Sequence, residues 1–365
     1  MVVIFRTPRM DNTGESRRRG RSTASEETVP CSVSVDVDDA VRPCKSPREM
    51  AQFVGIRHVR ETTHTIVKRL LITNPNAGQG RPERRKETIR QFCALMKERG
   101  FDVEVRSTTG PNDAARLAAE AAGEGFREVI VSGGDGTINE VLQGLVGTGV
   151  RMAVWPGGTA NVLGIELHLP RRVERLVEVI AESRVVRARV ACVTIEKTGE
   201  QRYFLLMAGI GFDAAIVDRV KPALKKRVGK AAFWYSGLEN FALWRPREFV
   251  LEIDGQQHIA TFAALGKTPR YGGNLAITPR ARLDYPHFEV CVIHSVHRLR
   301  FLKLLPFVML GGIPERMKGI SYLQASHVRA TGEGVLAQID GELIGSLPMT
   351  FAMTSHVIEV VTGGP

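Results

Sequence analysis

The chain of 365 residues has few cysteines, and none of them are close together in the sequence. Its five cysteines are scattered and no two form a Cys-x-x-Cys pair, which argues against a disulfide framework and a zinc site. It also lacks a run of about 18 apolar residues, the length needed to cross a bilayer. The nearest candidate, Phe301–Ile313, is interrupted by Lys303 and Pro306. Since the apolar stretch near Met1 is too short for a signal peptide, we expect a cytoplasmic protein that meets membranes only peripherally.

Two common phosphate-binding loops are missing as well. The chain has neither the Lys-Ser/Thr ending of a P-loop nor a GxGxxG turn, and it has no recognisable DNA- or RNA-binding signature. Its net charge is +11 and its sequence pI is about 9.7. We therefore expect anionic partners such as a nucleotide or acidic phospholipids, and no nucleic acid. A basic protein without a charged partner is the plainer alternative.

Composition changes divide the chain into three parts. Residues 1–62 have an Arg-rich run, Ser/Thr/Pro-rich pieces and no sustained apolar period, which predicts a disordered tail. Residues 63–185 predict a nucleotide-binding α/β domain and residues 186–365 a β-sandwich domain.

Strands and helices alternate in the middle part, which predicts a mainly parallel sheet with helices on both faces. The strands are expected at Ile66–Thr73, Phe101–Arg106, Glu128–Val131 and Arg151–Trp155, and the helices at Pro82–Arg99, Asn112–Ala122, Thr137–Leu145, Ala160–Leu167 and Arg172–Glu182. Ligands bind at the carboxyl ends of such strands. The turns there are rich in Gly, Asn and Thr: Asn74–Gly80, Thr108–Gly110, Gly133–Thr137 and Pro156–Asn161.

Short β-like runs separated by turn signals dominate the last part, which predicts an antiparallel sandwich. They are Arg187–Ile195, Tyr203–Ala208, Glu248–Ile253, Ile259–Gly266, Phe288–Ile293, Ile320–Ala325, Val335–Ile339 and Val357–Val361. A basic amphipathic helix is expected at about Lys225–Trp244. Its lysines lie beside aromatic residues, so it fits an anionic membrane surface or, equally, a solvated helix that covers the sandwich.

The most informative stretch is REVIVSGGDGTINEV, Arg127–Val141. An apolar strand meets Gly133-Gly134-Asp135-Gly136, and a threonine and a helix follow. Glycines let the backbone approach a ligand closely, and a helix start offers unpaired N–H groups and a positive dipole end to phosphate. The carboxylate of Asp135 beside phosphates calls for a cation.

Four motifs occur in order: NPNAG, GGDGTINEV, PGGTAN and DGE, at Asn74–Gly78, Gly133–Val141, Pro156–Asn161 and Asp340–Glu342. Together they resemble the diacylglycerol kinase catalytic family, above all its bacterial soluble lipid kinases, and the related sphingosine and ceramide kinases. GIGFDA (Gly209–Ala214) and YGGNLAITPRA (Tyr271–Ala281) resemble segments of the family's second domain. The resemblance covers about Arg69 to Val361. It implies an α/β domain and a β-sandwich domain with the active site in the cleft between them, and transfer of the γ-phosphoryl group of ATP, with Mg²⁺, to a lipid hydroxyl.

The resemblance carries site residues onto this chain. Matching nucleotide-contact positions are Asn74, Pro75, Gly78, Thr108, Gly133, Gly134, Asp135, Gly136, Thr137, Asn139, Glu140, Gly158 and Thr159. Any one of them alone is as well explained as an ordinary loop residue. We expect Asp135 to hold Mg²⁺ through water or, alternatively, to cap the following helix. For Asn139 and Glu140 a supporting role is favoured over direct chemistry.

Asp340 and Glu342 form a second acidic pair at a turn after a strand. The resemblance implies that this motif supplies the proton acceptor, and the sequence does not choose between the two carboxylates. An ordinary Asp-Gly hairpin turn is the alternative for this motif alone.

One segment departs from the family. Where bacterial members usually carry LDDGL, which helps to bind a structural Mg²⁺, this chain has Leu283-Asp284-Tyr285-Pro286-His287. We therefore expect that structural metal site to be lost.

The sequence favours an ATP-dependent diacylglycerol-type kinase at the inner face of the membrane. Kinases for sphingosine, ceramide or, less well, NAD are the alternatives, together with a catalytically silent nucleotide- or lipid-binding regulator. The acceptor lipid and the oligomeric state stay open.

Overall fold

The computed structural model describes residues 68–77, 82–158, 160–211, 214, 246–271, 275–297, 299–314 and 317–364. All of them belong to one compact unit, Thr63–Pro365. The predicted tail and the predicted helix Lys225–Trp244 lie outside the described residues, as do Gly78 and Thr159.

The first half of this unit is a parallel sheet with helices on both faces. Its strands run in the order β2-β1-β3-β4, and every neighbouring pair is parallel. The strands are β1 (Arg69–Thr73), β2 (Val103–Ser107), β3 (Glu128–Gly133) and β4 (Arg151–Pro156), and the helices are α1 (Pro82–Glu98), α2 (Asp113–Gly123), α3 (Asp135–Leu145), α4 (Val162–Glu166) and α5 (Val173–Glu182).

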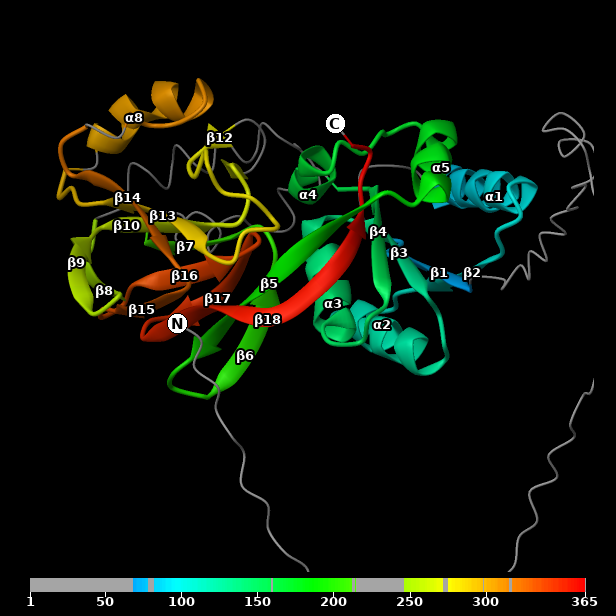
Figure 1. The fold of residues 1–365 in the computed structure, drawn as a ribbon, viewed down its shortest axis with the longest axis horizontal. Helices are drawn as coiled ribbons and strands as arrows, with labels where there is room; N and C mark the ends of the chain where they lie inside the picture. The colour runs from blue at the N-terminus through cyan, green and yellow to red at the C-terminus, as the bar shows by residue number, and fades with distance from the viewer. Residues whose placement is uncertain are drawn as a thin grey trace, which may run out of the picture. The chain divides into compact units, whose positions relative to one another are not determined.

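Alternation along the strands explains the two helical layers. Leu70 and Ile72 pack with α2 and α3 in one apolar cluster, whereas Leu71 between them packs with α1 and α5 in another. Every residue of β1 is buried, as expected for a parallel strand that is covered on both sides. Figure 1 shows α1 and α5 side by side, away from α2 and α3.

The described residues of the second half form an antiparallel β-sandwich and one helix. Its elements are β5 (Val185–Ile195), β6 (Glu200–Phe204), β7 (Met207–Gly211), β8 (Phe249–Ile253), β9 (Gln256–Ala260), β10 (Phe262–Gly266), β11 (Arg270–Tyr271), β12 (Leu275–Ala276), β13 (Phe288–Ile293), α8 (Leu299–Met309), β14 (Ile320–Ala325), β15 (His327–Thr331), β16 (Leu336–Ile339), β17 (Glu342–Ser346) and β18 (Met349–Val361). One sheet of the sandwich has the order β14-β13-β10-β7-β16-β17. The predicted fold class is therefore confirmed.

The long strand β18 joins the two halves. Near its end Val360 pairs in parallel with Met152 of β4. Strand β18 pairs antiparallel with β5 along its length and with β15 near its start. The parallel sheet thus continues through β18, β15, β8 and β9 as the second sheet of the sandwich (Figure 1). Side chains of this extension, such as Phe351 and Leu251, pack against Ile210 and Val290 of the other sheet in a shared core.

Several predicted elements need correction. The predicted strand Tyr203–Ala208 is two strands, β6 and β7, with Leu205 and Leu206 in the turn between them. The predicted strand Ile259–Gly266 is likewise divided between β9 and β10. The sequence analysis also missed β15, β17 and α8, and it recognised only the last five residues of β18.

No helix among the described ranges is both long and apolar enough to cross a bilayer.

Candidate active site

Three turns at the carboxyl ends of the parallel strands are bonded to one another. The backbone N–H of Asn74, after β1, donates to Ser132 O at 3.1 Å, and that of Gly157, after β4, donates to Gly133 O at 2.8 Å. The side chain of Asn74 donates to Thr137 Oγ1 on α3 at 3.0 Å and accepts from the N–H of Asn76. The predicted residues Asn74 and Thr137 therefore meet at one edge of the sheet.

Glycine is required where two of these turns touch. A side-chain carbon at Gly133 would lie 2.6 Å from Cβ of Thr137, and one at Gly158 would lie 2.6 Å from Cα of Gly134. The N-cap Gly134 has no side chain to cap α3. The first turn of α3 consequently presents backbone N–H groups and the positive end of the helix dipole beside a surface made of backbone, which suits phosphate.

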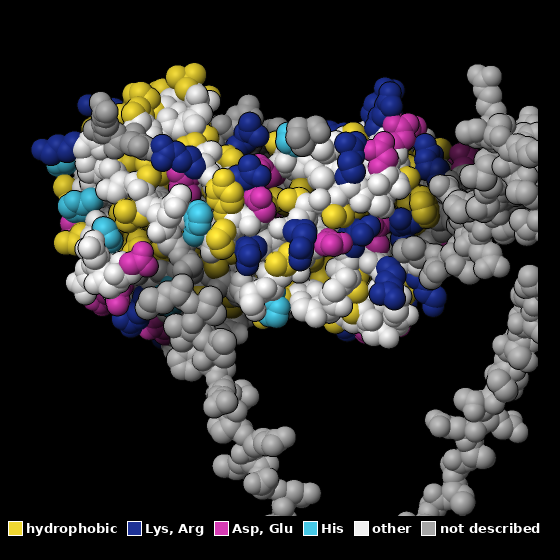
Figure 2. Space-filling model, in the orientation of Figure 1, with side chains coloured by type: hydrophobic (Ala, Val, Ile, Leu, Met, Phe, Trp, Pro, Cys, Tyr) yellow, Lys and Arg dark blue, Asp and Glu magenta, His cyan; other side chains and the backbone are white. Residues whose placement is uncertain are grey.

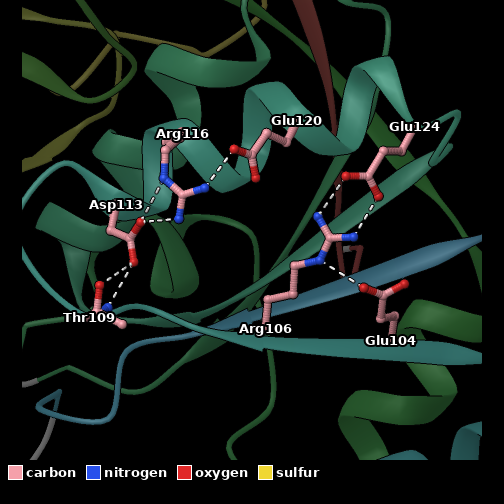
Figure 3. Close-up of polar contacts among 7 residues, drawn as sticks. All are labelled: Glu104, Arg106, Thr109, Asp113, Arg116, Glu120 and Glu124. Carbon is pink, nitrogen blue, oxygen red and sulfur yellow. Dashed lines mark hydrogen bonds and ion pairs between the residues drawn. The ribbon is translucent and has the colours of Figure 1, made fainter.

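The fourth turn, which follows β2, is held by a polar network on α2. Thr108 is buried, and the N–H and Oγ1 of the next residue, Thr109, donate to Asp113 Oδ2 at 2.8 and 3.0 Å. These hydrogen bonds, with Arg116, lower the pKa of Asp113. Figure 3 shows Asp113 between Thr109 and Arg116, with Glu120 on the far side of the guanidinium.

Asp340 is enclosed by hydrogen-bond donors. Its φ is 47°, so the turn after β16 is left-handed at this residue. Oδ1 accepts the N–H groups of Leu206 and Met207 at 2.9 and 3.1 Å. Oδ2 accepts the N–H of Leu205 and Nδ2 of Asn139, both at 3.0 Å. Burial raises the pKa of Asp340, and the four hydrogen bonds act in the opposite direction.

Asn139 links the glycine-rich motif to this turn. It lies on α3, is only 2% exposed, and donates from Nδ2 to Asp340 Oδ2 and to Tyr203 O. Gln143, one helical turn further on, donates to Oδ1 of Asn139 and to Tyr203 O. Asn139 and Asp340 are 201 residues apart in sequence, and the buried amide of Asn139 links the two motifs.

Glu342, at the start of β17, lies against the glycine-rich turn itself. A side-chain carbon at Gly136 would be 2.6 Å from Oε1 of Glu342. Arg202 of β6 forms an ion pair with the other carboxylate oxygen at 3.4 Å, and the Glu342 side chain is 36% exposed. Unlike Asp340, Glu342 therefore borders both the turn and solvent.

Asp135 and Asp340 line the same small pocket. The other residues that line it are Ile138, Asn139, Leu142, Leu163, Leu205 and Leu206. The glycine-rich motif and the DGE motif thus each contribute one carboxylate to this pocket, and the roles of these carboxylates stay predictions.

Glu140 contacts helix α2, unlike its neighbour Asn139, which contacts the DGE turn. Its Oε2 accepts the N–H of Ala114, in the first turn of α2, at 3.3 Å. The N-cap residue of α2, Asn112, makes no side-chain cap hydrogen bond. Glu140 thus binds the start of α2, and its predicted nucleotide contact stays a prediction.

The sequence analysis missed a cation at this edge. The guanidinium of Arg85, on α1, donates from Nη1 to Ala77 O, and from Nη2 to Ser132 O at 3.1 Å. Burial lowers its pKa. Arg85 thereby connects the turn after β1 to the end of β3. An arginine inside a charged helix carries no sequence signal for this role.

The donor set suits magnesium that arrives with a nucleotide. Among the residues placed by the structure, no group of three or more His, Cys, Asp and Glu could hold a metal ion. Mg²⁺ keeps several waters and is commonly bound by one or two carboxylates together with substrate phosphates. Asp135 is the acidic residue in the first turn of α3, and its contact with magnesium stays a prediction.

The altered segment 283–287 is held by a lysine. Lys267 is fully buried, and its Nζ donates to the carbonyl oxygens of Arg282, Leu283 and Tyr285 at 3.2, 3.1 and 2.7 Å. Asp284 pairs with Arg282 at 3.0 Å. The carbonyl oxygens that face inward already accept hydrogen bonds from an ammonium group, which is itself a cation. These residues therefore do not fit a metal site.

Comparisons with known proteins agree with this geometry. A family profile described as the diacylglycerol kinase catalytic domain matches residues 68–193, and one described as the YegS C-terminal NAD kinase beta sandwich-like domain matches residues 207–362. The chain belongs to the lipid kinase family that carries the diacylglycerol kinase catalytic domain. Its second half is of the YegS type.

Three relatives illustrate the similarity. A protein of Chromohalobacter salexigens named "Probable lipid kinase YegS-like" is 30% identical over 70% of this chain and 82% of its own length. A diacylglycerol kinase of Mycobacterium tuberculosis (strain ATCC 25618 / H37Rv) is 27% identical over 82% of this chain and 96% of its own length. The crystal structure of a diacylglycerol kinase from Bacillus anthracis has a TM-score of 0.62 at 21% identity, covering 82% and 98% of the two chains. This last match shows the shared fold.

We predict that Arg85→Ala raises the KM for ATP, the co-substrate that a kinase family implies, by about tenfold, because lost hydrogen bonds to a charged group cost about 1.5–3 kcal/mol. Steady-state kinetics at varied ATP measure it. Arg84→Ala removes the adjacent exposed guanidinium and serves as the control. A KM for ATP within about twofold of wild type in Arg85→Ala would contradict the prediction.

We predict that Lys267→Met lowers the free energy of unfolding by about 2–4 kcal/mol at pH 7, since buried carbonyl oxygens lose their donor. Urea unfolding measures the loss, and Lys318→Met removes an exposed ammonium as the control. EDTA should leave wild-type unfolding unchanged. A lower free energy of unfolding of wild type in EDTA would instead show that a structural metal ion is bound.

The same variant tests a pH dependence. Burial lowers the pKa of Lys267 from 10.5 to about 8. Between these values the unfolded chain keeps the proton that the folded chain has lost, so stability rises with pH. Wild type should therefore gain up to about 3 kcal/mol over Lys267→Met between pH 8 and 10. A difference that stays flat or shrinks over this range would show an unshifted lysine.

Proposed function

We propose that this protein is an ATP-dependent kinase that transfers the γ-phosphoryl group to a lipid hydroxyl, with diacylglycerol as the acceptor and phosphatidic acid as the product. One observation carries the proposal: Glu342 lies against Gly136 of the glycine-rich turn, while Asn139 of that motif binds Asp340. A proton acceptor and a phosphate-binding turn from distant parts of the chain are thereby brought together, and the names of the relatives favour a lipid acceptor.

The strand-end turns supply the nucleotide site in this proposal. Backbone N–H groups at the start of α3 bind phosphate oxygens, and Gly133, Gly134 and Gly158 keep that surface free of side chains. The other residues proposed to contact the nucleotide are Asn74, Pro75, Gly78, Thr108, Gly136, Thr137, Asn139, Glu140 and Thr159. Asp135 would hold Mg²⁺, which neutralises phosphate charge when it is bound.

We assign the proton acceptor to Glu342 in preference to Asp340. Both oxygens of Asp340 already accept hydrogen bonds, four in all, and protonation would weaken them. Glu342 is partly exposed, where a lipid hydroxyl can reach it. The hydroxyl proton passes to Glu342, the hydroxyl oxygen attacks the γ-phosphorus, and the bond from that phosphorus to the oxygen bridging to the β-phosphorus breaks, so that ADP leaves. Asp340 acts as a positioning residue.

We place this reaction at the inner face of the cytoplasmic membrane, where ATP and the lipid meet. The α/β part, residues 63–185, binds the nucleotide and the sandwich part, residues 186–365, receives the lipid. An anionic membrane surface is the proposed peripheral partner, and this is in keeping with the net charge of +11.

We predict that Glu342→Gln lowers kcat by about 10²–10⁴-fold, the usual contribution of a general base, without changing the melting temperature or the Kd for ATP. Asp340→Asn should lower both kcat and stability, the latter by about 2–4 kcal/mol, because an amide NH₂ would face backbone N–H donors. Turnover assays measure kcat, calorimetry measures stability, and ATP titration measures the Kd, so that the effects on catalysis and on folding are separated.

Glu359→Gln is the matched control for Glu342→Gln. Glu359 is 46% exposed and pairs with Arg151 at 3.3 Å, against 36% and 3.4 Å for Glu342 and Arg202. Its removal should leave kcat unchanged. Near-normal turnover in Glu342→Gln would show that Glu342 is not the proton acceptor.

The lipid class is tested by phosphorylation of a panel with radiolabelled ATP. We expect diacylglycerol in mixed micelles to accept phosphate at least about tenfold faster than ceramide or sphingosine, and NAD to accept none. Faster phosphorylation of ceramide or sphingosine would replace the proposed acceptor. Product from no member of the panel, with ATP binding intact, would favour a silent regulator.

A further inference from the structure

Helix α8 packs one face on the sandwich. Leu304 and Val308, four residues apart, are 3% and 8% exposed. They belong to an apolar cluster with Phe262, Ile293 and Ile320, which lie on strands of the six-stranded sheet. This face is the ordinary core-facing stripe of an amphipathic helix.

The opposite side of α8 and its two ends are also apolar, although they face solvent. The exposed fractions are 58% for Val296, 63% for Leu299, 37% for Phe307, 56% for Met309 and 87% for Leu310. These residues, here called the α8 tip, are five of the ten exposed large hydrophobic side chains found among the described residues. Figure 2 shows hydrophobic side chains gathered over α8. Such clustering, unlike scattered exposed leucines, marks an interaction site.

The charge around the tip is positive. Lys303 on α8 and Lys318 beyond it are exposed, and residues 294–319 contain two further arginines besides Arg300 and a single acidic residue, Glu315. Apolar side chains flanked by cations match the boundary between the headgroups and acyl chains of an anionic bilayer. A second copy of this chain fits poorly, because it would bring like charges together.

The tip is connected to the candidate active site through two short strands. Helix α8 contacts β12, β12 pairs with β11, and β11 contacts α4, the helix that follows the turn containing Gly158. The two short strands β12 and β11 thus lie between α8 and the nucleotide-binding half.

We propose that the α8 tip is the membrane-docking surface, which inserts Leu299, Phe307 and Leu310 into an anionic bilayer while Lys303 and Lys318 contact lipid headgroups. This inference rests on the proposed lipid kinase function, since the tip would serve to bring the enzyme to a substrate that is dissolved in the membrane. The docking surface is formed by residues that take no part in the chemistry.

The test uses the full chain with phosphatidylcholine vesicles that contain or lack phosphatidylglycerol. Leu299→Glu/Leu310→Glu should weaken binding to anionic vesicles at least about tenfold. Loss of one inserted leucine alone would have about this effect, so it is a lower bound for the double variant. Lys303→Glu/Lys318→Glu should weaken the same binding and reduce its dependence on salt. Ile259→Glu, at a residue 56% exposed on β9, is the matched control and should bind as wild type does.

Activity separates this inference from the proposed function. Leu299→Glu/Leu310→Glu should lose phosphorylation of diacylglycerol in vesicles but keep that of a short-chain, monomeric diacylglycerol. The docking surface would be overturned if this variant bound vesicles as well as wild type, if Ile259→Glu lost as much binding, or if wild type did not bind at all. It would also be overturned if wild type formed a dimer and the variant were monomeric. Vesicle binding that depends on the tip, without phosphorylation of any diacylglycerol, would instead refute the proposed acceptor.

Discussion

The candidate site depends on the hydrogen bonds that Asp340 accepts. Three come from consecutive backbone N–H groups, those of Leu205 and Leu206 in the turn between β6 and β7 and that of Met207 at the start of β7, and one comes from Asn139 of α3. Four donors fix the orientation of this carboxylate. Its replacement is costly because each donor would be left buried and unsatisfied. Through it the sandwich, the glycine-rich helix and the DGE turn have one relative position, and Glu342 is placed at Gly136.

The continuous sheet supports this arrangement at larger scale. Because β18 pairs with β5 along one edge, and with β15 near its start and β4 near its end along the other edge, the parallel and antiparallel parts share a row of backbone hydrogen bonds. The carboxyl ends of the parallel strands and the turn after β16 consequently adjoin without relying on side-chain contacts alone. The loop at 282–285 is held differently, by a side-chain ammonium group among backbone carbonyl oxygens.

Local patterns account for what could be predicted of the fold. Alternating strands and helices with glycine-rich turns indicated the parallel sheet, and strands buried on both faces, such as β1 and β3, carried the strongest signal. The elements that were missed have mixed environments. β17 is only partly buried, and β18 has half-buried and exposed residues in its middle as it passes from one half of the molecule to the other. The break at Leu205 and Leu206 has no turn residue to mark it, since Asp340 supplies the bonds that stabilise it.

By itself the sequence determined the chemistry that is available: glycines for a phosphate turn, Asp135 for a cation, and a second acidic pair. These depend on residue type and short spacing, which are local properties. Only the tertiary structure decided how the pair divides, with Asp340 enclosed by donors and Glu342 open to the turn. It also showed that Arg85 and Asn139 hold the turns, and that the Lys267 ammonium group binds the carbonyl oxygens of Arg282, Leu283 and Tyr285. Such roles arise from contacts between distant segments, and the physical reason is that burial and hydrogen-bond partners are properties of the packed chain.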